Sequence, residues 1–336
     1  MKLANRFTDY RKKLRSVLKI IVPLALGGII LWWMYRGMDW AVVVKALRTD
    51  MNWSWMLLSF PFGILAQVLR ALRWRQALRP MGERPRLSVC TDAIFLSYAS
   101  SLVVPRAGEV VRCGILRRFE GVSFSRSVGT VFTERVVDML TIAVLALLTF
   151  VLQIPVFMAF FRRTGISLTS VLSGFTWAGY AVTFASGILA LFMGWLLWKR
   201  LRHFARTRSV ISELREGLLS VRRVDSPLLF ILYSIGIWAC YYMHFYLTFY
   251  CFSTTSALGP MVALVAFVVG TFAVLVPTPN GAGPWHFAVK TVLMLYGIAG
   301  DTGALFALIV HTIQTLLVAA LGIWSIGHLM TVEPTK

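Results

Sequence analysis

The stretch SLVVPRAGEVVRC, residues 101–113, interrupts an apolar run with charged residues. Pro105 cannot continue a helix, and Gly108 permits a tight turn with exposed backbone amides. The stretch therefore predicts two helical arms that meet at a Pro/Gly break.

The charges beside this break have a pattern that suits an anion. A helix that begins near Glu109 would present its N-terminal amides, which favour an anion such as phosphate. Arg106 and Arg112 would add contacts to the same oxygens. An ordinary turn is the alternative interpretation of the same residues.

The chain around the break is strongly apolar. Of its 336 residues, 58% are hydrophobic and 14% are charged, whereas roughly a quarter of the residues of a soluble domain are charged. Several apolar runs are long enough to cross the ~30 Å of bilayer hydrocarbon. The composition predicts an all-α polytopic membrane protein.

The net charge of +20 would suggest nucleic acid as the partner of a soluble protein. Here, however, the basic residues gather between apolar runs, at 2–19, 70–86, 106–126 and 199–223. This is the positive-inside pattern of cytoplasmic loops, and basic faces also suit anionic headgroups. We therefore expect cytoplasmic N- and C-termini and no nucleic-acid partner.

About six full spans are expected within a single transmembrane domain, 17–330, between a basic N-terminus, 1–16, and a tail, 331–336. The expected spans are 17–35, 53–72, 127–152, 174–198, 227–252 and 304–328. The basic flanks require segment 88–125 to begin and end in the cytoplasm, so it is expected to be a re-entrant hairpin. The basic segment 199–226 is expected to be an amphipathic interfacial helix, or a connecting helix only.

A second apolar segment, 261–298, is broken at VPTPNGAG by Pro277, Pro279, Gly281 and Gly283. Two full crossings and a second re-entrant hairpin both fit its charge pattern, and by analogy with the first hairpin we expect re-entry. Each of the regions 53–152 and 227–328 has a span, a Pro-broken segment and another span, and they enter the membrane from opposite sides. Paired breaks of this kind indicate an inverted repeat with a binding site at the breaks.

Three charged residues occur inside the span SVGTVFTERVVDMLTIAVLALL, namely Glu134, Arg135 and Asp138. Their spacing puts them on a similar sector of a helix, and intramembrane charges by default mark a functional site. We expect Arg135 to pair with Asp138 and Glu134 to pair with Arg106 or Arg112. A polar cavity for a charged headgroup would result, although an ion-pair cluster that only fixes the helix is the alternative.

Other polar residues are candidates for the same cavity. Asn280 and His286 belong to the second break, and His244 lies in the aromatic stretch WACYYMHFYLTFY. His311 and Gln314, one turn apart, occupy the place in the second half that Glu134 and Asp138 hold in the first. Aromatic packing for His244, and a helix–helix hydrogen bond for His311 and Gln314, are equally simple accounts.

The sequence offers little for catalysis. It has no HExxH, GxSxG or Walker motif, and its four cysteines, Cys90, Cys113, Cys240 and Cys251, have no metal-binding spacing. We expect no cofactor, no metal site and no enzymatic activity.

The segment PRAGEVVRCGILRRFEGVSFSRSVGTVFTERVVDML, residues 105–140, resembles the lysylphosphatidylglycerol synthetase/flippase transmembrane-domain family. That family has a Pro-x-x-Gly-Glu loop, an arginine and a Glu-Arg-x-x-Asp helix. VPTPNGAGPWHFA is similar to its second loop, with two departures, since Asn280 replaces a glycine and His286 stands where glutamate is common. The resemblance does not extend to the aminoacyl-transfer domain of the two-part members.

The resemblance implies a bacterial inner-membrane lipid translocase. The expected partner is a membrane phospholipid or polyprenyl-phosphate lipid, whose phosphate would meet Arg106, Arg112 and Arg135 while Glu109, Glu134 and Asp138 hold those arginines. A homo-oligomer or an envelope-synthesis enzyme is a candidate protein partner. The alternative function is that of an enzyme or accessory subunit in envelope lipid or glycan assembly.

Overall fold

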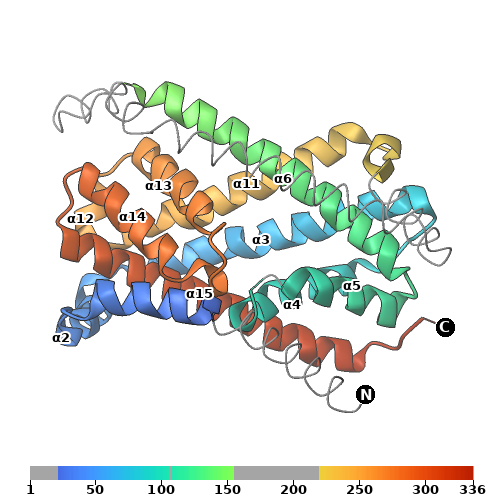
Figure 1. The fold of residues 1–336 in the computed structure, drawn as a ribbon, viewed down its shortest axis with the longest axis horizontal. Coiled ribbons are helices and arrows are strands. Elements are labelled where there is room, and N and C mark those ends of the chain that lie inside the picture. The colour runs from blue at the N-terminus through green and yellow to red at the C-terminus, as the bar shows by residue number, and fades with distance from the viewer. Residues whose placement is uncertain (1–21, 106, 155–218, 336) are drawn as a thin grey trace, which may run out of the picture.

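The computed structural model describes residues 22–105, 107–154 and 219–335, and these residues form helices and connecting loops with no β-strand (Figure 1). The expected span 174–198, most of the segment 199–226 and Arg106 lie outside the described residues.

Among the described residues, four helices are long and apolar enough to cross a membrane. They are α3 (Trp53–Leu78), α6 (Phe124–Leu152), α11 (Pro227–Tyr246) and α15 (Gly300–Thr331). The 3₁₀ turns η2 (Arg79–Met81) and η4 (Leu247–Cys251) extend α3 and α11. These four helices match four of the expected spans, so an all-α membrane protein is confirmed.

Local sequence explains where two of these helices begin. The side chain of Asn52 accepts a hydrogen bond from the Ser54 amide and so caps α3. Pro227 is the first residue of α11, a position where the missing proline N–H costs no helical hydrogen bond.

Both expected breaks separate pairs of short helices. Residues around Pro105 separate α4 (Leu87–Val103) from α5 (Ala107–Glu120). A loop containing the single turn η5 (Pro279–Gly281) separates α13 (Pro260–Ala273) from α14 (Pro284–Leu295). The helices of each pair pack against one another, so each break closes a helical hairpin.

Shorter elements surround the second hairpin. They are the helix Val22–Tyr35, α2 (Trp40–Lys45), the π-turn η1 (Ala46–Asp50) and α12 (Ser253–Ser256). The helix Val22–Tyr35 lies against the second break, because a Cβ on Gly283 would come 2.9 Å from the Cβ of Ile30.

The packing of the long helices joins the two halves of the chain. Helices α3 and α11 run side by side through the centre (Figure 1). Helix α4 of the first hairpin packs on α15, α13 of the second hairpin packs on α6, and η5 contacts α4. Each hairpin therefore packs against the last long helix of the other half, and the second break contacts the first hairpin.

Candidate functional site

Five charged side chains form a continuous ion-pair chain between α3, α5 and α6. Arg70 and Arg73 donate to the two carboxylate oxygens of Asp138, at 2.6 and 2.8 Å. Arg73 Nε also lies 3.9 Å from Glu134 Oε1, and Glu134 Oε2 accepts a hydrogen bond from Arg112 at 2.8 Å. All five residues are at most 6% exposed. The ion-pair chain runs Arg70–Asp138–Arg73–Glu134–Arg112.

Part of this arrangement agrees with expectation and part corrects it. Glu134 pairs with Arg112 as predicted. The predicted Arg135–Asp138 pair does not form, since Arg135 lies 2.8 Å from Glu109 in a pair whose side chains are 42% and 43% exposed. Glu134 and Asp138 are one turn apart and face α3, whereas Arg135 is rotated by about 100° from Glu134.

Arg70 and Arg73 were missed as site residues. The charge pattern assigns them to the cytoplasmic end of the expected span 53–72 and to the loop after it, but α3 continues to Leu78 and buries both arginines. A usable signal was their spacing of three residues at the end of an apolar helix, which puts both on one face. Two carboxylates inside a neighbouring span require such partners.

The ion-pair chain has more positive than negative groups, three guanidinium groups against two carboxylates. Arg112 uses one nitrogen for Glu134, and its Nε and Nη2 are buried with no hydrogen-bond partner among the described residues. The Arg112 Cζ lies 4.8 Å from the Trp74 ring centroid, a cation–π contact that stabilises the guanidinium charge. Buried N–H groups without partners are uncommon, so the Arg112 end of the ion-pair chain has hydrogen-bond donors that could bind an anion.

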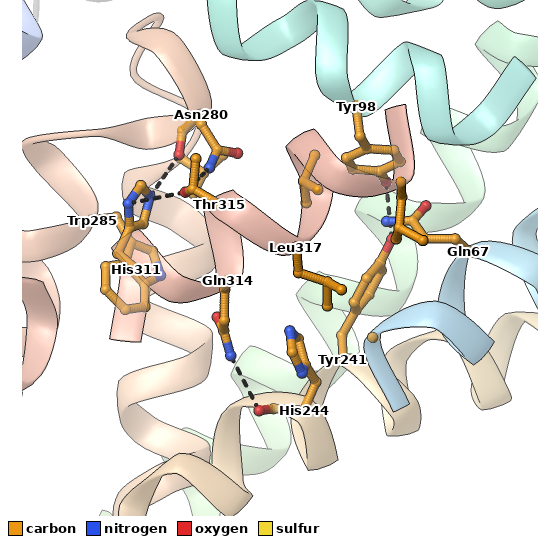
Figure 2. Close-up of a pocket in the computed structure, with 14 residues that line it drawn as sticks. Gln67, Tyr98, Tyr241, His244, Asn280, Trp285, His311, Gln314, Thr315 and Leu317 are labelled. Atoms are coloured by element: carbon orange, nitrogen blue, oxygen red, sulfur yellow. Dashed lines mark hydrogen bonds between the residues drawn. The ribbon is translucent and has the colours of Figure 1, made fainter. Parts of the chain in front are cut away.

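A cavity of about 240 Å³ lies beside the ion-pair chain and is lined by α3, α4, α11, α15 and the second break (Figure 2). His244, His311, Gln314 and Asn280, all predicted candidates, line it together. Gln67 and the two tyrosines Tyr98 and Tyr241 line it as well, and these three were not predicted.

The second break contributes a closed set of hydrogen bonds to this cavity. Asn280 donates to Thr315 Oγ1 at 2.8 Å, Thr315 lies 3.4 Å from His311 Nδ1, and His311 Nε2 donates to the Asn280 carbonyl at 3.0 Å (Figure 2). Asn280 has a left-handed φ of 50°, a conformation that asparagine tolerates better than most residues. The break is thereby fastened to α15.

The glycines of the second break shape it. Gly281 and Gly283 have φ values of 71° and 92°, which side chains rarely adopt. The amide of Gly283 donates to His286 Nδ1 at 3.3 Å. The His286 ring lies 4.4 Å from that of His311 but does not line the cavity. Pro277 lies shortly before the turn in the sequence, and Pro279 begins η5.

The cavity and the ion-pair chain meet at Tyr241. The Tyr241 hydroxyl donates to the Tyr98 hydroxyl at 3.0 Å, and both rings line the cavity. Arg70 Cζ lies 5.9 Å from the Tyr241 ring centroid. One aromatic ring therefore separates an uncharged cavity from a net positive group of side chains.

Within the described ranges, no three His, Cys, Asp or Glu side chains come close enough to hold a metal ion. Among the predicted residues, Arg112, Glu134 and Asp138 join the ion-pair chain and Asn280, His244, His311 and Gln314 join the cavity. Gly108, Glu109 and Arg135 lie at the first hairpin and its partner helix.

Comparisons with known proteins give three relatives. Glycosyltransferase AglD of Haloferax volcanii is 30% identical over 137 residues, 40% of this chain and 22% of that protein. The matched region is thus about a fifth of the length of that relative. Two UPF0104 membrane proteins of Methanothermobacter thermautotrophicus are 23% and 25% identical, covering 73% and 95% of this chain and 75% and 92% of their own lengths. No solved structure matches the chain.

The family model described as the lysylphosphatidylglycerol synthase TM region matches residues 20–322. This match spans both helical hairpins, the ion-pair chain and the cavity. The chain therefore belongs to the lysylphosphatidylglycerol synthase TM region family and is a multi-pass membrane protein.

Proposed function

We propose that this chain is a lipid translocase that moves a phosphate-bearing headgroup across the bilayer while the acyl or prenyl tails stay in lipid. The observation that carries the proposal is the buried ion-pair chain with its excess guanidinium. Intramembrane arginines are costly, and arginine is suited to the oxygens of phosphate. Arg112, with two buried nitrogens that no described residue engages, is the residue that would first receive the phosphate.

The proposal includes an exchange of partners. In the described conformation Arg112 and Glu134 are paired and 1% exposed, so the headgroup phosphate would replace Glu134 as the partner of Arg112 when the first hairpin moves. A carboxylate that competes with the substrate for the same arginine keeps Arg112 paired between transport events. Removing either partner alone would leave a buried charge uncompensated.

Re-entry of both hairpins into the bilayer belongs to the same proposal. Helices α4 and α5 have 17 and 14 residues, which is about 26 and 21 Å at roughly 1.5 Å per residue. Helices α13 and α14 have 14 and 12 residues, about 21 and 18 Å. Each is shorter than the ~30 Å hydrocarbon thickness, which favours re-entry over two full crossings.

An inverted repeat is supported by the reciprocal packing of the halves. Helices α3, α4–α5 and α6 correspond in order to α11, α13–α14 and α15. Helix α4 packs on α15 and α13 packs on α6, as a two-fold relation between halves requires. In transporters built this way the breaks in the helices form the binding site near the membrane midplane.

The test is a headgroup-sidedness assay in proteoliposomes that contain the purified chain and a fluorescent phosphatidylglycerol. We expect the wild type to expose inner-leaflet probe to an external quencher, and the double variant Arg112→Gln/Glu134→Gln, which removes both charges of one pair, to lose at least tenfold in rate. The control Arg79→Gln alters a surface arginine 46% exposed in its side chain and should keep the wild-type rate. No movement in the wild type, or full movement in the double variant, would refute the proposal.

A second candidate is an enzyme or accessory subunit in envelope lipid or glycan assembly, and the similarity to part of a glycosyltransferase favours it. Mass spectrometry of lipids incubated with the chain separates the two functions. Unchanged lipid masses together with movement support translocation, whereas a covalently altered lipid supports the enzymatic alternative.

A further inference from the structure

We infer that the cavity beside Tyr241 is a subsite for an uncharged, hydroxyl-bearing group, such as a glycerol or a sugar ring, attached to the lipid phosphate. This inference rests on the proposed function and names the class of headgroup that the site would take.

The lining of the cavity disfavours a charged occupant of either sign. The described residues that line it offer amides, phenols, a threonine hydroxyl and two imidazoles among apolar residues, with no arginine, lysine, aspartate or glutamate. A buried ion without a counter-charge is strongly disfavoured. An ammonium group would also lie near the net positive ion-pair chain, since Arg70 is 5.9 Å from the Tyr241 ring.

The unused hydrogen-bonding groups of the cavity favour a ligand that donates. His244 Nδ1 must donate to the Ser59 carbonyl, 2.8 Å away, which leaves Nε2 of a neutral ring as an acceptor. Gln314 donates to the His244 carbonyl at 3.2 Å and Asn280 donates to Thr315, so the amide oxygens of both remain acceptors. The oxygens of a phosphodiester carry no hydrogen and cannot donate to such groups, whereas hydroxyl groups can.

A glutamine on α3 gives independent support. Gln67 lines the cavity, is only 6% exposed, and its Oε1 is buried with no hydrogen-bond partner in the described part of the chain. Figure 2 shows its amide beside the Tyr98–Tyr241 pair. A buried amide oxygen without a partner is expected to be satisfied by a ligand or water, and a hydroxyl group can donate to it.

The size of the cavity limits the occupant. Its volume of about 240 Å³ is below the roughly 300–1,000 Å³ of sites for drug-sized ligands. It fits a headgroup substituent rather than an acyl tail. Arg70 is the end of the ion-pair chain that meets Tyr241. A phosphate at this end and a substituent in the cavity would occupy adjoining environments that match their charge.

The experiment compares four fluorescent lipids in the proteoliposome assay, namely phosphatidylglycerol, phosphatidylinositol, phosphatidic acid and phosphatidylethanolamine. We expect at least one of the two hydroxylated lipids to move about tenfold faster than phosphatidic acid and phosphatidylethanolamine. Faster movement of phosphatidylglycerol would indicate a subsite for glycerol, and faster movement of phosphatidylinositol would indicate a subsite for a sugar-like ring. If phosphatidic acid moves as fast as the hydroxylated lipids, or phosphatidylethanolamine moves faster than they do, the subsite is overturned while translocation still stands.

Gln314→Leu tests the cavity, with Gln76→Leu as its matched control. Both glutamines donate to a backbone carbonyl, Gln76 to Ser226 at 2.7 Å, but only Gln314 lines the cavity. In Gln314→Leu, loss of one hydrogen bond to the headgroup should lower the rate for the preferred lipid roughly fivefold. The rate for phosphatidic acid should stay within about twofold of the wild-type rate. In Gln76→Leu the preference between the two lipids should not change. An unchanged preference in Gln314→Leu contradicts the inference.

If no lipid moves at all, translocation fails but the subsite is still decided by binding. Native mass spectrometry of the purified chain with phosphatidylglycerol, phosphatidylinositol or phosphatidic acid then gives the result. A preference for a hydroxylated lipid that Gln314→Leu removes supports the subsite, and equal binding of all three overturns it.

Discussion

Asp138 accepts hydrogen bonds from two arginines that lie one turn apart on α3, and all three residues are buried. We predict that Asp138→Asn lowers the free energy of unfolding by about 3–5 kcal/mol, because two buried guanidinium groups lose their shared carboxylate. Denaturant titration in detergent micelles measures this change.

The control for this prediction is Asp225→Asn. Asp225 lies 4.0 Å from Arg79, and the side chains are 64% and 46% exposed, so the pair is solvent-screened and its loss should cost less than about 1 kcal/mol. Equal effects of the two substitutions would show that the buried ion-pair chain contributes no more to the free energy of unfolding than a surface pair does.

At the residue scale the sequence predicts which side chains are unusual better than it predicts their partners. Glu134 and Arg112 are identified from charge inside apolar segments, and they do pair. Arg70 and Arg73 are not identified, because positive residues at a helix end are equally typical of a cytoplasmic loop. Only the three-dimensional approach of α3 to α6 distinguishes these two cases.

At the element scale, Gly108 decides whether the first hairpin can close. A Cβ at this position would overlap the Ser97 carbonyl oxygen and lie 2.6 Å from the Ser97 hydroxyl oxygen. We predict that Gly108→Ala destabilises the chain by about 1–3 kcal/mol or more, because α4 and α5 must separate to admit the methyl group. The midpoint of thermal unfolding in detergent is the measurement.

Gly114→Ala is the matched control in the same helix. Apart from the local helix backbone and the two neighbouring residues, no described atom lies within 4 Å of the Cβ that would be added there. Alanine in a helix is favoured over glycine by about 0.5–1 kcal/mol. The control should therefore raise the midpoint slightly. A similar fall in both variants would mean that the close α4–α5 contact is not what limits substitution at Gly108.

The positions of the helical breaks could be predicted from local chemistry, because proline and glycine act on the backbone within a few residues. The exact ends of the long helices could not, since α3 was expected to end at Leu72 and continues to Leu78. The apolar pattern ends where arginines begin, but ion pairs to α6 allow the helix to continue through them.

At the scale of the whole molecule, the two halves are joined where α4 crosses α15. A Cβ on Gly322 would overlap the Cβ of Ala99 on α4. We predict that Gly322→Ala lowers the free energy of unfolding by about 1–3 kcal/mol through overpacking and disturbs the first hairpin. The control Gly327→Ala should do neither, because no described atom beyond the local backbone and the two neighbouring residues lies within 4 Å of the added Cβ. Limited proteolysis of the α3–α4 and α5–α6 loops, alongside thermal unfolding, measures both effects.

Contacts between halves are the part of the fold that the sequence does not predict. The order of spans and breaks suggests that α4–α5 and α13–α14 are equivalent, but it does not say which helix each hairpin covers. That choice depends on residues such as Ala99 and Gly322, more than 200 positions apart, whose small size is visible in the sequence and whose juxtaposition is not.

Membrane topology gives the last prediction. The four cysteines, Cys90, Cys113, Cys240 and Cys251, are buried, so an introduced cysteine should be labelled over a low background. We predict that Arg84→Cys and Arg118→Cys, exposed at the two open ends of the first hairpin, react with a membrane-impermeant maleimide only from the cytoplasmic side. Val103→Cys, 68% exposed at the tip, should be unreactive from outside, because helices of about 26 and 21 Å do not reach the far surface of ~30 Å of hydrocarbon. Labelling of Val103→Cys from outside in sealed cells would instead require two full crossings.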